Sequence, residues 1–337
     1  MNIELQDISI LNIIQKNKTK VLMICFAMIF LLTILSGSVL ANTEEEDMII
    51  NIQTPPTVAA LPIFWMLENN MLDYDLEFSI RLSGDHSRGV SLIAQDELDM
   101  IITGVNVGAR AFNRGIDLKL VNTNIWAIDY LLTNGFKAES WKDLKGKTMS
   151  LPLQGGPLDF LARYLLINNG VDPEEMNLLY RPLQNGARTF QLGNLDSIIL
   201  PEPMLSITLN NTENAYLSMD IQEEWGKLHN GEERIPFIGL FASGTFARNN
   251  RELLESINHY YKEGVEWVNN NPRAAAEMAA MYFDMPAPII EQSFSRIDLN
   301  IYPTAEAYTI TELFFNEILD MYPEMIGGKL PNELFYF

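Results

Sequence analysis

Short apolar runs alternate with longer segments of helical periodicity from Met48 to the end of the chain. The first such runs lie at residues 48–52, 76–82 and 98–103, with a helix that ends near Asn70 and another near residues 88–95 predicted between them. This alternation is typical of an α/β fold, in which crossover helices cover a mainly parallel sheet. The 337 residues are enough for two domains of ordinary size.

The middle and the end of the chain continue the pattern. Further strands are predicted at residues 118–122, 130–133, 148–151 and 177–180. Helices are predicted at residues 158–168, 185–192, 251–269, 272–283 and, less regularly, 289–319. We expect a polar stretch at residues 210–233, an extended segment at 235–246 and a loosely packed tail at 321–337.

Two segments of the chain resemble each other. Residues 91–104 and 189–203 both contain a helix end, a polar corner, the dipeptide Leu-Asp, an apolar strand and a loop of Gly or Pro residues. Two similarly built lobes are the simplest account of this similarity.

The N-terminus has the composition of a secretory signal. Lys16, Lys18 and Lys20 precede the apolar run at residues 21–35, and small residues lead to Ala41. A basic region, an apolar core and small residues before a cleavage point predict export, with a signal at residues 1–41 cut after Ala41. The alternative is an uncleaved anchor, because residues 21–41 could reach about 30 Å as a helix. Both interpretations place the remainder outside the cytoplasm.

Charge excludes one class of partner. The formal net charge is −21, and such an acidic surface repels phosphate backbones, so no nucleic acid is expected as a partner. The acidity indicates solubility or, alternatively, selection of a cationic ligand. The only cysteine is Cys25, inside the apolar run, so an internal disulfide is impossible.

An ordered series of motifs resembles one protein family. The series includes residues 62–72, the loop at Gly104, DLKGKTMSLP at 143–152, GVDPEEMNLLYRPL at 170–183, LGNLDSIILPEP at 192–203 and the helix pair at 246–280. Together these motifs resemble the NMT1/THI5-like, or nitrate–sulfonate–taurine, type of substrate-binding protein of ABC transporters. The resemblance covers roughly residues 48–285.

The resemblance implies a type II periplasmic binding protein. In that fold two α/β lobes are joined by two crossing segments, here expected at residues 127–135 and 236–243. Lobe one would comprise residues 48–128 plus 237–337, and lobe two residues 129–236. A small molecule would bind in the cleft by hinge closure, and the partner would be a transporter permease with its ATPase. No cofactor and no metal are implied.

Ligands of open α/β lobes lie beyond the carboxyl ends of the strands, near helix N-termini and free backbone N–H groups. Four loops meet this description and also match cleft-lining loops of the family. The candidate ligand-binding residues are Thr54, Pro55 and Thr57; Gly104, Val105 and Asn106; Gln154, Gly155, Gly156 and Pro157; Glu202; and Trp126 before the first crossing.

These residue types suggest particular contacts. Gly155 and Gly156 would let a ligand approach the backbone, whose N–H groups could hold a carboxylate, sulfonate or carbonyl, unless they form a plain turn. Glu202 could pair with a cationic group or be a solvated loop residue, and Trp126 could stack on a flat ligand. Asp159 is expected to compensate the helix dipole. The ligand class stays open between pyrimidine-like, amine, sulfonate and nitrate.

Enzymatic function is not expected. His86, His229 and His259 have no metal-ligand spacing, no thiol remains after signal removal, and no Gly-x-Ser-x-Gly elbow occurs. Two other hypotheses remain beside the transporter component. One is a membrane-tethered ligand-sensing domain, and the other is an extracytoplasmic enzyme that uses Glu202 or Asp159 as a base.

Overall fold

The computed structural model describes residues 48–72 and 76–337. The predicted signal at residues 1–41 lies outside the described residues. Residues 49–337 form one compact unit, which contains both sheets apart from Met48. A search of residues 48–72 and 76–337 finds no helix that is both long and apolar enough to cross a membrane.

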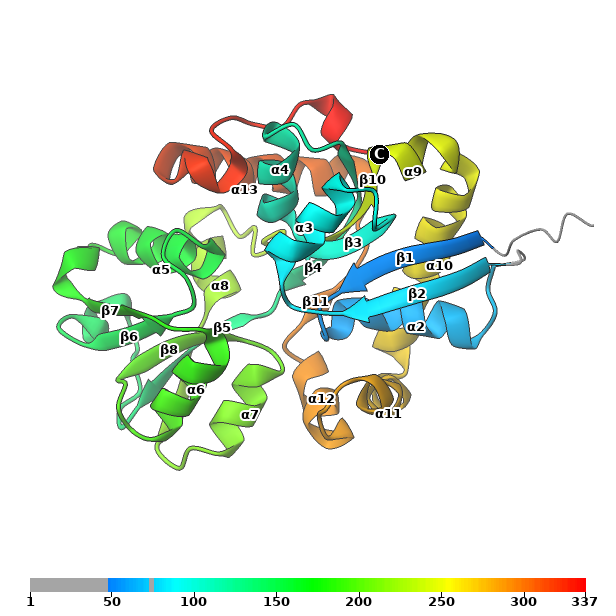
Figure 1. Cartoon of the computed structure of the whole chain (residues 1–337). Coiled ribbons are helices and arrows are strands. Elements are labelled where there is room, and N and C mark those ends of the chain that lie inside the picture. Colours follow the sequence, from blue (N-terminus) through cyan, green and yellow to red (C-terminus); the bar gives the residue numbers. More distant parts are fainter. Residues whose placement is uncertain (1–47, 73–75) are drawn as a thin grey trace, which may run out of the picture. The chain divides into compact units, whose positions relative to one another are not determined.

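The first sheet of the described chain has six strands in the order β11–β4–β10–β3–β1–β2 (Figure 1). Their bounds are β1 Met48–Thr54, β2 Leu76–Leu82, β3 Met100–Gly104, β4 Leu118–Ala127, β10 Ile238–Ser243 and β11 Asp298–Leu299. Strands β1 and β3 pair in parallel. Strand β10 is antiparallel to both of its neighbours, β3 and β4.

The second sheet has five strands in the order β7–β6–β8–β5–β9. Their bounds are β5 Asp129–Asn134, β6 Thr148–Leu151, β7 Asn177–Tyr180, β8 Ser197–Pro201 and β9 Ala215–Asp220. Strand β6 is parallel to β7 and β8, whereas β5 is antiparallel to β8 and β9. Four strands therefore share one direction, and β5 runs against them.

The reversed strands mark the two crossing segments. Strand β4 continues through Ile128 directly into β5, and the chain returns through residues 229–237 into β10. A strand that arrives from the other sheet enters at the end where the local strands finish, so it runs opposite to them. This arrangement confirms the predicted α/β fold, with two sheets flanked by helices and joined by two crossings.

Each sheet has its own helices (Figure 1). Those that follow strands of the second sheet are α5 Pro157–Asn168, α6 Leu183–Gln191, α7 Met204–Asn210 and α8 Ile221–Leu228. The other α-helices of the described chain are α2 Leu61–Glu68, α3 His86–Ala94, α4 Val105–Asn113, α9 Gly244–Asn249, α10 Arg251–Asn270, α11 Pro272–Tyr282, α12 Ala287–Phe294 and α13 Thr304–Met321. The short 3-10 turns are η1 Val58–Ala60, η2 Trp141–Leu144, η3 Pro173–Glu175, η4 Pro323–Ile326 and η5 Glu333–Phe335.

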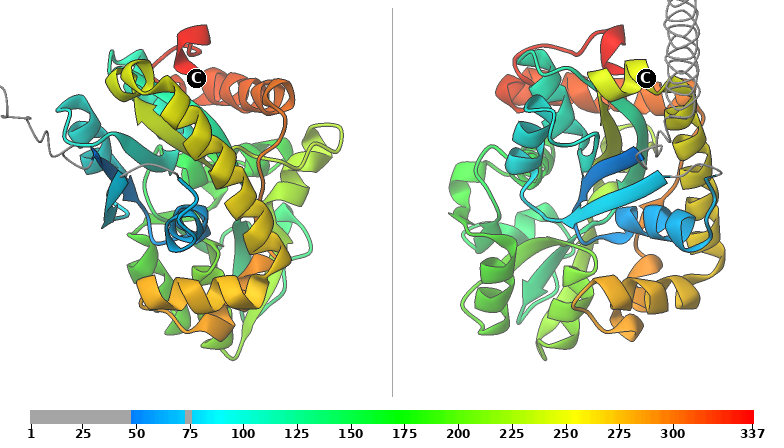
Figure 2. Two further views of the ribbon diagram at one scale, coloured as in Figure 1. Left: turned by 90° about the vertical axis from the view of Figure 1, so that its right-hand side faces the viewer. Right: turned by 45° about the vertical axis from the view of Figure 1, so that its right-hand side comes forward.

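The long helix α10 passes beside α2 and leads into α11 (Figure 2). Its apolar residues recur at helical spacing and are buried, as the sequence predicts. Gly264 permits the close approach, because a Cβ atom at this position would lie 2.8 Å from Cα of Pro62. The helix is therefore held by a backbone contact as well as by its apolar stripe.

The predicted internal similarity extends to single contacts. Asp99 before β3 accepts a hydrogen bond from the backbone N–H of Asn51 in β1, at 2.8 Å. Asp196 before β8 accepts the corresponding bond from the backbone N–H of Thr148 in β6, also at 2.8 Å. The corners before the two aspartates contain residues with positive φ, Asp96 in one case and Gly193 in the other. The two helix–corner–strand units are thus built alike.

One expectation is wrong, and three others are incomplete. The polar stretch at 210–233 also contains β9 and α8, and its residue Asp220 caps α8 by accepting from the backbone N–H groups of Gln222 and Glu223. The segments at 235–246 and 289–319 also contain α9 and the short strand β11, respectively. Residues 321–337 do not form a loose tail, because Ile326 and Phe335 are fully buried and Tyr336 forms a bridge to Leu120 of β4.

Candidate functional site

The register of the strands brings the carboxyl ends of both sheets to the crossing. In the first sheet, Gly104 at the end of β3 pairs with Ile238, the first residue of β10. In the second, Pro201 at the end of β8 pairs with Asp129, the first residue of β5. The central strands of both sheets therefore finish at the segments that join the sheets.

Backbone hydrogen bonds hold these strand ends in place. The N–H group of Val105 donates to the carbonyl of Phe237 in the return crossing, at 3.0 Å. The N–H group of Glu202 donates to the carbonyl of Ile128 in the first crossing, at 2.9 Å. Val105 and Glu202 occupy equivalent places in the duplicated units, so the same contact is made once from each side.

The predicted residues of the first sheet lie at this edge. The hydroxyl of Thr54 is buried and donates to the carbonyl of Pro55, at 3.1 Å. The buried hydroxyl of Thr57 has no partner among the described residues. Asn106 is buried in the first turn of α4, for which Gly104 is the N-cap. The loops after β1 and β3 thus supply one free hydroxyl and one buried amide.

Sequence reasoning missed a polar pair in the same region. His86 begins α3, after the cap Asp85, and its Nδ1 atom lies 2.9 Å from Oγ1 of the fully buried Thr103. Burial lowers the pKa of the His86 imidazole, and the negative charge of Asp85 opposes that shift. His86 is therefore neutral at physiological pH. His86 follows Gly84 and Asp85 shortly after the end of β2, and this position at a strand end could have identified it as a candidate site residue.

The glycine loop of the second sheet differs from expectation. Gly155 has φ +70°, which favours glycine. Its N–H group donates to Oδ2 of Asp159, at 2.8 Å, and the N–H group of Gly156 donates to the carbonyl of Leu153, at 3.1 Å. Both amides are internally satisfied. The hypothesis that these two N–H groups hold a ligand anion is therefore wrong for this conformation.

Asp159 organises this loop. Besides the Gly155 amide, it accepts hydrogen bonds at Oδ1 from Nε of Arg163 and from the hydroxyl of Tyr180, each at 2.9 Å. The carboxylate is buried, so the guanidinium compensates a charge that the helix dipole stabilises only in part. Gln154 is exposed beside this network, and Pro157 starts α5 at a position where its missing N–H group costs nothing.

Glu202 is neither free for a ligand nor solvated in this structure. Its carboxylate is fully buried and accepts from Arg296 Nη1 at 2.9 Å, from the Ser206 hydroxyl at 2.9 Å and from the Ser206 amide at 3.0 Å. Arg296 lies between α12 and β11, and its carbonyl accepts the hydroxyl of Tyr130 in β5, at 2.8 Å. An internal guanidinium thus occupies the place that we assigned to a cationic ligand.

Trp126 is also unavailable in this structure. Its ring is fully buried, its indole N–H group donates to the carbonyl of Asn300 at 3.0 Å, and Tyr302 packs edge-on at 5.3 Å. A ring enclosed in this way cannot stack on a ligand. The predicted stacking role is therefore wrong, and Trp126 supports the joint between β4 and β11.

A titratable group lies within the crossing itself. Burial, with a smaller contribution from the negative charge of Asp220, raises the pKa of Asp129 to about 7. Gln222 brackets the backbone of Asp129, accepting from its N–H group at 3.1 Å and donating to its carbonyl at 3.0 Å. The start of β5 is therefore both rigidly held and sensitive to pH.

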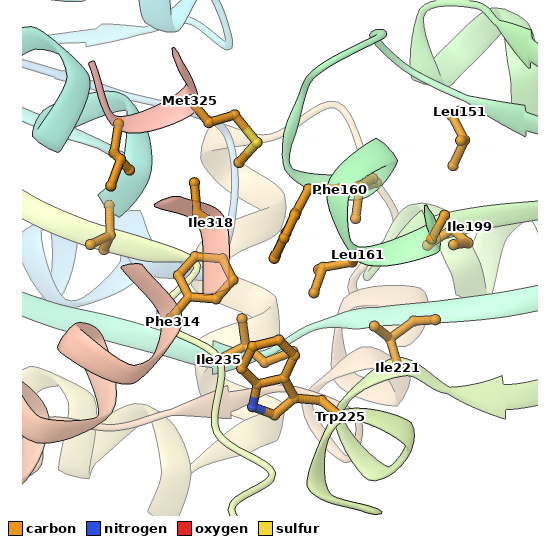
Figure 3. Packing of buried hydrophobic residues seen from close by; sticks show 14 of the residues in the cluster. Leu151, Phe160, Leu161, Ile199, Ile221, Trp225, Ile235, Phe314, Ile318 and Met325 are labelled. Carbon is orange, nitrogen blue, oxygen red and sulfur yellow. The ribbon is translucent and has the colours of Figure 1, made fainter. Parts of the chain in front are cut away.

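An aromatic cluster packs helices from both sheets against each other (Figure 3). Phe160 of α5 lies 5.9 Å from Phe314 of α13, and Trp225 of α8 lies 5.8 Å from the same ring. Ile235 in the return crossing belongs to this cluster. The two sheets are therefore connected by apolar contact as well as by the crossing strands.

The described residues contain no group of three or more His, Cys, Asp or Glu side chains that could hold a metal ion. Besides Asp129 in the crossing, the polar groups described for this region are hydroxyls, amides, a neutral imidazole and the carboxylates of Asp159 and Glu202. Each of these two carboxylates is paired with an arginine. Of these groups, the Thr57 hydroxyl has no hydrogen-bond partner among the described residues.

Two sheets of this topology, joined by reversed crossing strands, define the type II periplasmic binding protein fold. The family model described as NMT1/THI5 like matches residues 73–275, more than half of the chain. The protein therefore belongs to the NMT1/THI5-like family. No curated protein matches the chain.

Solved structures show the same fold. An ABC transporter protein from Parabacteroides distasonis is 19% identical, with a TM-score of 0.73 over 86% of this chain and 99% of that one. The ligand-binding component of an ABC-type import system from Staphylococcus aureus is 10% identical, with a TM-score of 0.68 over 86% and 96%. The periplasmic aliphatic sulphonate-binding protein of Escherichia coli is 16% identical, with a TM-score of 0.68 over 86% and 92%.

Proposed function

We propose that the protein is the extracytoplasmic solute-binding component of an ABC importer. The observation that carries this proposal is the symmetric attachment of Val105 and Glu202 to the two crossing segments. Polar loops of both sheets thereby meet at one joint, where rotation would bring them together around a small molecule. Family membership and the names of the structural neighbours support the same function.

The proposal has a definite organisation. Lobe one comprises residues 48–128 and 237–337, and lobe two residues 129–236. The basic and apolar composition of residues 1–41 supports export, with cleavage after Ala41. Lobe one contributes Thr57, His86 and Asn106 to the cleft, and lobe two contributes the loop from Gln154 to Pro157. The transporter partner is a permease with its ATPase.

Solute binding and hinge closure can be measured together. We expect a bound solute to raise the melting temperature by mass action and to reduce the radius of gyration in small-angle X-ray scattering. The panel contains pyrimidines, amines, sulfonates and nitrate. A ligand that raises the melting temperature without any compaction would contradict hinge closure, and failure of all classes to bind would contradict the function.

The two other hypotheses have separate tests. N-terminal sequencing of protein recovered without membrane should find Asn42 first, whereas an intact N-terminus retained in membranes would favour a tethered sensor. An enzyme would need a base that its substrate can reach, yet the carboxylates of Asp159 and Glu202 are buried and each is paired with an arginine. Recovery of the solute unchanged after long incubation is the expected result.

A further inference from the structure

At equivalent places in the two sheets, a buried polar side chain leaves one atom without a partner. Gln53, the second-last residue of β1, is 1% exposed, and so is Ser150, the second-last residue of β6. Oε1 of Gln53 and Oγ of Ser150 accept or donate no hydrogen bond among the described residues. A buried unsatisfied polar group costs about 1–3 kcal/mol.

Each of these side chains lies under a helix that has a glycine to receive it. A Cβ atom on Gly89 of α3 would lie 2.5 Å from Nε2 of Gln53, and one on Gly186 of α6 would lie 2.9 Å from Oγ of Ser150. A glycine inside a helix costs about 1 kcal/mol relative to alanine. The same arrangement thus recurs at one point of both sheets, where the glycine also makes room for an isoleucine of the neighbouring strand, Ile101 in one case and Ile198 in the other. The unpartnered polar atom is the feature that this packing does not explain.

The orientation of the Gln53 amide follows from its one hydrogen bond. Nε2 donates to the carbonyl of Asp85, the cap of α3, at 3.0 Å. Exchange of the amide oxygen and nitrogen would bring two oxygen atoms together, so this exchange is excluded. Oε1 is therefore the atom without a partner, and an amide oxygen can be satisfied only by a hydrogen-bond donor.

The surroundings of Gln53 are those of the candidate site. Asp85 and His86 are the cap and the first residue of α3, after β2, and Thr57 follows Gln53 in the loop after β1. The hydroxyl of Thr57 likewise has no partner among the described residues. These groups carry no positive charge that would attract an anion, because the imidazole is held neutral by its burial. An oxyanion, which has only acceptor atoms, would place its lone pairs against Oε1.

We propose that Gln53 determines specificity by accepting a hydrogen bond from an N–H or O–H group of the solute. The site then selects a donor-bearing solute over an oxyanion of the same shape. This inference rests on the proposed function and names the ligand class of that site. Loss of one hydrogen bond to a buried group corresponds to about tenfold in affinity.

Matched probe pairs test the selection by calorimetry on the exported protein. The pairs are methanesulfonamide and methanesulfonate, nicotinamide and nicotinate, and benzamide and benzenesulfonate. Wild type should prefer the amide member of at least one pair about tenfold, and Gln53→Met should lose that preference. Thr208→Val is the matched control, because it removes another buried, unpaired hydroxyl and should keep the preference.

The outcomes separate this inference from the function on which it rests. Tighter binding of the anionic members by wild type overturns the inference and leaves the transport function standing. A preference that survives in Gln53→Met also overturns it, because a water molecule would then be the partner of Oε1. Binding of no probe counts against the function and the inference together. Gln53→Asn, which keeps an amide but shortens its reach, replaces the methionine variant if that variant fails to fold.

Discussion

Replacement of Arg296 by methionine would leave the buried carboxylate of Glu202 without its charged partner. The Glu202 side chain is 0% exposed, its partner guanidinium is 22% exposed, and the two groups are 2.9 Å apart. Removing one partner of a buried ion pair costs about 3–5 kcal/mol. The two hydrogen bonds from Ser206 remain in the variant, so we expect about 3 kcal/mol. For a unit of about 290 residues that loss lowers the melting temperature by roughly 5 °C.

The assay is urea denaturation at pH 7.5 of wild type, Arg296→Met and the double variant Glu202→Gln, Arg296→Met. The double variant should regain most of the loss, because its side chain at position 202 carries no charge. Arg273→Met is the control, since Arg273 and its partner Glu277 are exposed and such pairs contribute less than about 1 kcal/mol.

A dependence on pH provides an independent check. In Arg296→Met the uncompensated carboxylate takes up a proton more readily in the folded state than in the unfolded chain. The free energy of unfolding of the variant should therefore rise more steeply as the pH falls than that of wild type, so that the difference between the two proteins shrinks. A loss below about 1 kcal/mol, or a double variant no more stable than Arg296→Met, would refute the assignment of a buried charge.

Three further predictions concern other parts of the fold. Because burial raises the pKa of Asp129 to about 7, the folded protein keeps a proton that the unfolded chain releases between about pH 4 and 7. The contribution of Asp129 to the free energy of unfolding thus falls as pH rises through that window. Asp129→Asn should remove this pH dependence, and in urea titrations at pH 8 the variant should be more stable than wild type. Gly155→Ala should lower the free energy of unfolding by about 1–2 kcal/mol, because Gly155 has a φ of +70°. Gly155→Asn should lower it clearly less, because asparagine adopts this backbone conformation more readily than alanine. Equal losses for the two variants in thermal denaturation would count against backbone strain. Phe335→Ala should lower the free energy of unfolding by about 3–5 kcal/mol, because the ring is fully buried. Leu334→Ala, at an exposed position, should change it little. Small effects of both substitutions would instead indicate that residues 321–337 are loosely packed.

The amino-acid sequence by itself determined the class of fold and most of its elements. Strands at residues 148–151 and 177–180 follow from short apolar runs, and the long helix from Arg251 follows from apolar residues at helical spacing. These patterns are local, so they can be read without knowing what packs on them. The similarity between residues 91–104 and 189–203 likewise pointed to two units before any contact was known.

Only the tertiary structure decided which candidate groups are available. Trp126 and Glu202 have suitable chemistry and position, yet Asn300 and Arg296, far along the chain, occupy their polar atoms. The backbone N–H group of Gly155 donates to Asp159, only four residues away, but this hydrogen bond depends on a turn conformation that the amino-acid sequence does not show. Hydrogen-bond partners are set by the packing of distant segments, which a local pattern does not specify.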